Sequence, residues 1–141
     1  MSTTTINKSI FLNASRETVW AYLTEKDKLG EWFHPAADDL AEGKPYALLS
    51  DASDPDSKLC LGEVLSASKP SSLSYTFTVK PLGGAMTTVH WTLEEAAGGT
   101  RVTLTHEGVG EAAGEAALGL LSALDKGWDE HFSKLRDRAA A

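Results

Sequence analysis

The sequence predicts a two-layer α+β fold in which a curved antiparallel β-sheet grips one long C-terminal helix. Three segments between residues 71 and 107 alternate apolar and polar side chains, which is the period of a strand with one buried face. Residues 111–138 instead carry apolar side chains at helical spacing. Short turns rather than helices separate the strand-like segments, so we expect an antiparallel meander covered on one face by the helix.

The central sheet is predicted from these three segments and their turns. "SSLSYTFTVK" (71–80) is the clearest strand, and "TTVHWTLE" (87–94) and "TRVTLTHE" (100–107) repeat its alternation. The residues expected on the inward face are Leu73, Tyr75, Phe77, Val79, Val89, Trp91, Leu93, Val102, Leu104 and His106. "AAGGT" is typical of a tight hairpin, and "SASKPSS" and "PLGGAM" indicate two further turns. The direction of the strand around Cys60 stays open, because a bulge would reverse its faces.

The N-terminal third is predicted to hold one strand, residues 5–12, followed by two short helices. Ser15 is placed to cap the first helix. Thr24, with Asp27 three residues later, resembles a capping box and predicts the start of the second helix. The apolar residues that these helices bring toward the core are Val19, Trp20, Leu23, Leu29 and Trp32.

The C-terminal helix, residues 111–138, is predicted from one apolar stripe. At about 100° per residue the stripe is roughly 80° wide. Its members are Leu121, Leu124, Trp128, Phe132 and Leu135. Gly114, Gly119 and Gly127 interrupt the helix, and each costs on the order of 1 kcal/mol relative to alanine. A helix that keeps a glycine often needs close approach or free room on one side; the first two glycines also allow the regular helix to start after residue 111.

Charge and composition exclude several classes of function. The chain has 141 residues and a net charge of −7, whereas nucleic-acid binding needs clustered lysine and arginine. The N-terminus has no signal-peptide pattern, and no apolar run is long enough to span a membrane. We therefore expect one domain, residues 1–141, in the cytoplasm, with no nucleic-acid partner and no membrane insertion. The single cysteine, Cys60, lies in an apolar run and is expected to be buried and unreactive.

Four segments in succession carry a resemblance to a known family, and together they cover almost the whole chain. They are "INKSIFLNASRETVWAYLTEKDKLGEWF" (6–33), "LGEVLSASKPSSLSYTF" (61–77), "GGTRVTLTHEGVG" (98–110) and "GWDEHFSKLRD" (127–137). In this order they resemble the activator of heat-shock protein 90 ATPase homologue-like family, within the START and birch-pollen-allergen-like (SRPBCC) superfamily. No single motif is specific; the succession is.

The resemblance implies a helix-grip fold, with a seven-stranded or similar sheet wrapped on the C-terminal helix. It implies a cavity for an apolar small molecule in many superfamily members, but no single activity. The relatives include lipid carriers, hormone receptors, polyketide cyclases and co-chaperones. The eukaryotic co-chaperone carries an additional N-terminal domain for which these 141 residues leave no room, which weakens the co-chaperone interpretation.

The expected site is a cavity between the sheet and the C-terminal helix that binds a small hydrophobic or aromatic molecule, lipid-like or polyketide-like. Four tryptophans are more than a thin core needs, and flat aromatic side chains suit such a ligand. The expected lining residues are Trp32 and Phe33 at the entrance, Tyr46, Tyr75, Phe77, Val89, Trp91, Leu104 and His106 on the sheet side, and Leu121, Leu124 and Trp128 on the helix. The hydroxyl groups of Tyr46 and Tyr75 would orient the ligand. For each aromatic residue, packing in the core is the alternative.

The four histidines each have a functional and a structural interpretation. His106 ends an inward-facing series, so it could bond a polar ligand group or act as a base; the alternative is a satisfied structural histidine. Residues 129–131 fan outward around the helix, so a solvated face is expected rather than a metal site. His131 lies at the edge of the stripe, and a place beside the cavity is the alternative to the solvated face for it. His34 lies beside acidic residues, in what we expect to be a solvated loop rather than a divalent-metal site. His90 is expected to face solvent.

Three functions are therefore carried forward. The first is binding of a small hydrophobic molecule. The second is a co-chaperone-like or stress-response interaction module with a chaperone partner, which a solid core would favour. The third is a cyclase- or hydrolase-like enzyme with His106 as base. The sequence holds no phosphate loop, cysteine cluster or nucleophile elbow, so no catalytic residue, metal or cofactor is assigned and an enzyme is not expected.

Overall fold

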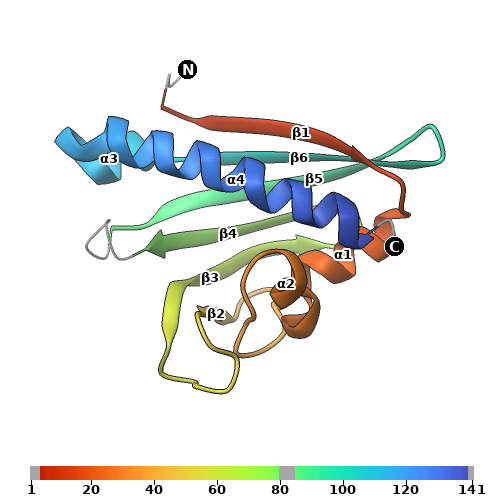
Figure 1. Ribbon diagram of the computed structural model, residues 1–141, viewed down its shortest axis with the longest axis horizontal. Coiled ribbons are helices and arrows are strands. Elements are labelled where there is room, and N and C mark those ends of the chain that lie inside the picture. Colours follow the sequence, from red (N-terminus) through yellow and green to blue (C-terminus); the bar gives the residue numbers. More distant parts are fainter. Residues whose placement is uncertain (1–3, 80–84, 140–141) are drawn as a thin grey trace.

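Six antiparallel strands form a curled open sheet around one long helix in the residues that the computed structural model describes, 4–79 and 85–139 (Figure 1). The elements are β1 (Ile6–Leu12), α1 (Arg16–Thr24), α2 (Lys26–Trp32), β2 (Pro45–Leu49), β3 (Lys58–Ser68), β4 (Ser72–Val79), β5 (Thr87–Ala96), β6 (Gly99–Glu107), α3 (Val109–Ala113), a 3₁₀ turn (Gly114–Ala116) and α4 (Ala117–Ala139). The strand order is β1-β6-β5-β4-β3-β2, so the first and last strands of the chain are neighbours. Figure 1 shows α4 crossing one face of the sheet, which confirms the helix grip.

The predicted alternation on β4, β5 and β6 is confirmed. Nine of the ten residues expected to face inward are at most 4% exposed: Leu73, Tyr75, Phe77, Val89, Trp91, Leu93, Val102, Leu104 and His106. The hairpin between β5 and β6 closes at the Ala96–Gly99 pair, with Ala97 and Gly98 at φ values of 51° and 87°. The left-handed backbone of a two-residue hairpin turn explains why the sequence places glycine there. The turn predicted at 81–86 lies mostly outside the described residues.

The strand around Cys60 turns its cysteine inward. Cys60 and Val64 are 3% and 1% exposed, whereas Leu61 and Leu65 point outward and are 40% and 49% exposed. An irregularity in the β3–β4 register lies between Val64 and Ser66. Because such a bulge exchanges the two faces of a strand, the sequence could not decide which side chains of this strand point inward. Burial raises the pKa of the Cys60 thiol to about 12, so the thiol stays protonated at neutral pH.

The two short helices are as predicted, but one of their caps is not. Ser15 caps α1, because its Oγ accepts a hydrogen bond from the Thr18 N–H at 3.2 Å. The capping box at Thr24 is wrong: Thr24 is the last residue of α1, and its hydroxyl donates to the Trp20 carbonyl at 2.9 Å. The N-terminus of α2 is capped instead from a distant loop, where Asp39 Oδ1 accepts from the Lys26 N–H at 2.8 Å.

Replacing Asp39 by alanine is expected to lower the free energy of unfolding by about 1 kcal/mol, because it leaves a helix N-terminus without its carboxylate acceptor. Asp38→Ala is the matched control, since the neighbouring carboxylate makes no hydrogen bond among the described residues. Urea denaturation of the two variants checks the expectation. Equal stabilities would show that the Asp39 cap contributes nothing measurable.

The regular C-terminal helix starts later than residue 111, which is the alternative that Gly114 and Gly119 left open in the sequence. The chain forms α3, then breaks at Gly114, whose backbone has φ 56° and ψ −121°, and α4 begins at Ala117. The left-handed φ at Gly114 favours glycine and ends α3. Gly119 and Gly127 remain inside α4, and a Cβ at either would meet no atom within 4 Å. None of the helices in the described part of the chain combines the length and apolar character that a bilayer span needs.

Candidate functional site

A pocket of about 230 Å³ lies between the middle of α4, the segment after α2, and strands β3 and β4. Its lining is mostly apolar: Phe33, His34, Leu59, Cys60, Phe77, Ala123, Leu124, Gly127, Trp128 and His131. The five residues from α4 recur at the spacing of one helix face. The same face carries the buried anchors Phe132 and Leu135 further along, so packing of the C-terminal half of α4 fixes the position of the pocket wall.

Phe33 forms the aromatic wall opposite the sheet. It is the C-cap residue that directly follows α2, and its ring stacks on Trp32 and on Trp128 with centroid distances of 5.2 Å in both cases. Stacked aromatic rings at this distance attract one another beyond simple burial. The ring of Phe77 lies 6.4 Å from Trp128. The pocket is therefore bounded by flat aromatic surfaces held by neighbours in the core.

Gly127 lies in the helix wall of the pocket with free space around it. A Cβ at this position would meet no atom within 4 Å, although the residue lies inside a 23-residue helix among lining residues. The sequence indicated this feature, because an interior helical glycine often needs close approach or free room. At Gly127 the structure shows room.

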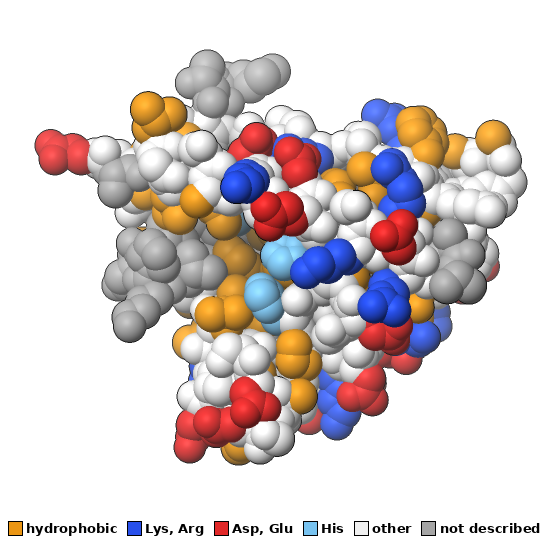
Figure 2. Space-filling view, in the orientation of Figure 1, with side chains coloured by type: hydrophobic (Ala, Val, Ile, Leu, Met, Phe, Trp, Pro, Cys, Tyr) orange, Lys and Arg blue, Asp and Glu red, His pale blue; other side chains and the backbone are white. Residues whose placement is uncertain are grey.

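Two histidines lie together at the edge of the pocket. The ring centroids of His34 and His131 are 5.3 Å apart, and the Phe33 ring packs on both. Figure 2 shows a pair of adjacent histidine side chains at the surface, bordered by hydrophobic side chains. Burial, with His131 and Lys134 nearby, lowers the pKa of His34 to about 4. Burial also lowers the pKa of His131, so both rings are neutral at pH 7.

The structure brings four of the twelve predicted lining residues to this pocket: Phe33, Phe77, Leu124 and Trp128. Seven others pack inside the core and do not line it: Trp32, Tyr46, Tyr75, Val89, Trp91, Leu104 and His106. The twelfth, Leu121, borders a separate shallow depression near the start of β1. The six lining residues that the sequence prediction omitted are His34, Leu59, Cys60, Ala123, Gly127 and His131. Only Gly127 and His131 carried a signal, as the interior glycine and the residue at the edge of the apolar stripe.

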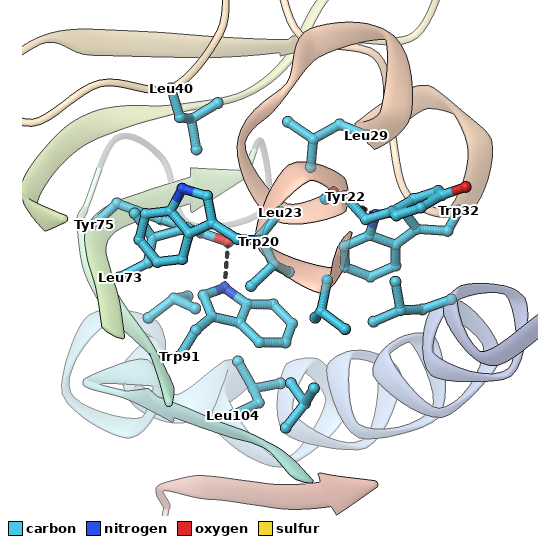
Figure 3. Packing of buried hydrophobic residues seen from close by; sticks show 14 of the residues in the cluster. Trp20, Tyr22, Leu23, Leu29, Trp32, Leu40, Leu73, Tyr75, Trp91 and Leu104 are labelled. Carbon is cyan, nitrogen blue, oxygen red and sulfur yellow. Dashed lines mark hydrogen bonds between the residues drawn. The ribbon is translucent and has the colours of Figure 1, made fainter. Parts of the chain in front are cut away.

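The core can hold so many aromatic residues because their polar atoms bond to one another or to the backbone. Figure 3 shows the bond from Trp91 Nε1 to the Tyr75 hydroxyl, 3.0 Å long. Trp32 Nε1 donates to the Tyr22 carbonyl at 2.7 Å, and the Tyr46 hydroxyl donates to the Thr76 carbonyl at 2.6 Å. The tyrosine hydroxyls expected to orient a ligand are therefore engaged within the protein.

His106 has the geometry of a structural histidine. Trp128 Nε1 donates to its Nδ1 at 3.3 Å, so its Nε2 carries the proton and donates to Thr87 Oγ1 at 2.7 Å. The Thr87 hydroxyl in turn donates a hydrogen bond to the Phe77 carbonyl at 2.7 Å. Burial lowers the pKa of His106 to about 4. Both ring nitrogens of His106 are hydrogen-bonded, so the residue holds the Trp128 indole in place and has no free nitrogen for a ligand or a reaction.

A second polar cluster lies on the outer face of the sheet. Ser74 Oγ is 2.8 Å from His90 Nδ1, and His90 Nε2 is 3.0 Å from Glu107 Oε1. These are the residue types of a hydrolase triad, but they lie on three adjacent strands whose backbone N–H groups pair within the sheet, which leaves no oxyanion hole. The cluster is a cross-strand hydrogen-bond ladder. Among the described residues, no three histidine, cysteine or acidic side chains lie close enough to share a metal ion.

Known proteins share the fold of this chain, and a family model then identifies its family. The fold matches solved structures of low sequence identity: CalU16 from Micromonospora echinospora (23% identity, TM-score 0.74, 93% of this chain and 73% of that chain), DynU16, a protein in the dynemicin biosynthetic locus (20%, 0.75, 96% and 47%), and the Aha1 dimer from Colwellia psychrerythraea (18%, 0.75, 96% and 96%). The model of the family "Activator of Hsp90 ATPase homolog 1-like protein" matches residues 13–140, so the chain belongs to that family. No curated protein gave a significant match.

Proposed function

We propose that this protein binds a small apolar, aromatic molecule in the pocket between α4 and the β3–β4 side of the sheet. The observation that carries the proposal is the free space at Gly127, among Phe33, Phe77 and Trp128. A glycine inside a helix costs about 1 kcal/mol relative to alanine, and nothing packed against Gly127 requires it. Because Gly127 also lines the pocket, we propose that it keeps this space open. We expect this binding to take place in the cytoplasm.

The volume limits the size of the ligand. A dry cavity of about 150 Å³ holds one benzene ring, and pockets for drug-sized ligands are usually above about 300 Å³. At about 230 Å³, this pocket suits one or two fused rings rather than a long lipid chain. A neighbour from the dynemicin biosynthetic locus agrees with a small-molecule ligand. The tail of a lipid-like ligand would extend outside the described pocket.

Filling the space at Gly127 is expected to abolish ligand binding without unfolding the protein. Gly127→Leu places an apolar side chain where the ligand would lie and removes the conformational cost of glycine in α4. Gly119→Leu is the matched control, because it lies in the same helix, also has open space, and does not line the pocket. The quenching of tryptophan fluorescence by a panel of one- and two-ring aromatic compounds measures the difference. Binding that survives Gly127→Leu would place the ligand elsewhere.

Native mass spectrometry of protein purified from its own host comes first, followed by denaturing extraction of anything bound. A stoichiometric apolar passenger would identify the ligand class. Quenching by the panel with no passenger would indicate a ligand that dissociates on purification. If no passenger is found and no compound of the panel quenches the fluorescence, the pocket has no ligand-binding role.

A co-chaperone-like interaction module is the second candidate, because most of the predicted cavity residues form a solid core. Large apolar side chains also lie on the outside, with Phe11 64% and Leu65 49% exposed. Stimulation of the ATPase of an Hsp90-type chaperone tests this role directly. The expected result for an interaction module is stimulation that Gly127→Leu leaves unchanged and that Phe11→Ser or Leu65→Ser weakens; an unstimulated ATPase would exclude it.

A further inference from the structure

The hydrogen bonding of His131 fixes which of its nitrogens is free. His131 Nδ1 lies 3.2 Å from the Trp32 backbone carbonyl, and a carbonyl oxygen can only accept. Nδ1 therefore carries the proton, and in a neutral ring Nε2 is left with a bare lone pair. Nε2 has no hydrogen-bond partner among the described residues. Every side-chain nitrogen or oxygen that is buried from solvent in the described part of the chain has a hydrogen-bond partner, so the unpartnered Nε2 must be in contact with solvent. Nε2 is thus an accessible acceptor on a residue that lines the pocket.

The surroundings keep this acceptor neutral. Burial is the main cause that lowers the pKa of His131, and Lys134 acts in the same direction, whereas the Trp32 carbonyl and Glu130 act against it. The neighbouring His34 ring is neutral for the same main reason. The edge of the pocket therefore presents two uncharged imidazoles, and Nε2 of His131 keeps an unprotonated lone pair.

We propose that the ligand of this pocket is a hydroxylated aromatic molecule, a phenol or enol on one or two fused rings, whose hydroxyl donates a hydrogen bond to His131 Nε2. The apolar lining from Phe33, Phe77 and Trp128 holds the ring system, and the acceptor nitrogen of His131 at the edge orients it. The inference rests on the proposed function, because it names the chemical class that the same pocket selects.

A carboxylate does not satisfy this geometry, since its oxygens would meet the lone pair of Nε2 rather than a donor. The exposed Lys134 is the group near both histidines that would attract an anion. A pocket that prefers a neutral hydroxyl therefore indicates recognition by His131, and one that prefers an anion indicates recognition by Lys134.

Three probes with one ring system test the proposal: 2-naphthol, 2-methylnaphthalene, in which a methyl group replaces the hydroxyl, and 2-naphthoate. Isothermal titration calorimetry is carried out on the unmodified protein and on His131→Phe, which keeps a ring beside Phe33 and removes the acceptor. We expect 2-naphthol to bind about tenfold more tightly than 2-methylnaphthalene, the worth of one hydrogen bond to an otherwise unpaired acceptor. In His131→Phe the two affinities should become equal through loss of naphthol affinity alone.

The other outcomes separate failure of the inference from failure of the proposed function. Equal binding of 2-naphthol and 2-methylnaphthalene to the unmodified protein, blocked by Gly127→Leu, would overturn the hydroxyl preference and leave pocket binding intact. Tighter binding of 2-naphthoate would overturn it in favour of Lys134. No binding of any probe would overturn both.

Nitrogen NMR of the unmodified protein gives a readout that does not depend on the His131→Phe variant folding. The Nε2 resonance of His131 should move on addition of 2-naphthol and stay in place with 2-methylnaphthalene, because only the first can donate to it. The same shift with both probes would contradict the proposed hydrogen bond.

Discussion

Replacing Gly62 by alanine is expected to lower the free energy of unfolding by at least about 3 kcal/mol, or the melting temperature by roughly 10 °C. A Cβ on Gly62 would lie 1.9 Å from the Thr76 carbonyl oxygen and 2.8 Å from Tyr46 Cε1. A carbonyl inside a sheet cannot swing away as a side chain can. The ring of Tyr46 cannot retreat freely either, because its hydroxyl is bonded to the same carbonyl.

The close approach at Gly62 lies on β3 shortly before the register shift between Val64 and Ser66. Thr76 bonds there through side chains as well as backbone: its carbonyl accepts from Tyr46, and its hydroxyl accepts from the Glu63 N–H at 2.9 Å. Gly119→Ala is the control, because that helical position is open and alanine should stabilise it by up to about 1 kcal/mol. Differential scanning calorimetry of the two variants measures the contrast. A melting temperature for Gly62→Ala within roughly 2 °C of the unmodified protein would show that the strands separate easily.

The stability of the protein is expected to fall by about 3 kcal/mol between pH 6.5 and pH 4 because of His106 alone. Burial lowers the pKa of this histidine from 6.5 to about 4 in the folded protein. Above pH 6.5 the ring is neutral in both the folded and unfolded states, so pH has no effect. As the pH falls below 6.5, the unfolded chain binds a proton that the folded protein does not, which favours unfolding; below about pH 4 both states are protonated. The shift is worth about 1.4 kcal/mol per unit.

Urea denaturation at pH 7 and pH 4.5 measures this slope, with two variants for comparison. His106→Phe lacks the titrating group and should lose most of the slope, although it also leaves Trp128 and Thr87 without a partner and is less stable at every pH. His34→Gln should lose less of the dependence of stability on pH, because His34 is only half-buried and solvent screens its charge. An NMR titration of the unmodified protein that gave His106 a pKa near 6.5 would contradict the expectation directly.

The sequence predicted the fold well where periodicity is long and regular. Alternation over β4, β5 and β6 identified nine buried residues, and the stripe on the C-terminal helix identified Trp128, Phe132 and Leu135. Local rules were less reliable. The capping box at Thr24 failed because a carboxylate from Asp39, in a loop, took over the cap, and a contact between residues distant in the chain leaves no local signal.

The candidate site was predicted only in part for a related reason. An inward-facing aromatic residue looks the same in the sequence whether it lines a cavity or fills the core. Trp91 and Tyr75 can lie in the core because the indole N–H of Trp91 donates a hydrogen bond to the Tyr75 hydroxyl. The two residues are brought together by the register of the neighbouring strands β4 and β5. Phe33 lines the pocket because α2 ends just before that residue, whose ring stacks on Trp32 and on Trp128.

Composition and periodicity by themselves determined the α+β class, the gripping helix, the inward faces of the central strands and the buried state of Cys60. They could do so because burial of one face imposes a repeating pattern on neighbouring residues. The tertiary structure decided the rest: which aromatic residues line the pocket, that Gly127 has open space beside it there, and that His131 directs one nitrogen to the Trp32 carbonyl and leaves the other without a hydrogen-bond partner among the described residues. These properties depend on distances between segments far apart in the chain, and no local pattern encodes such distances.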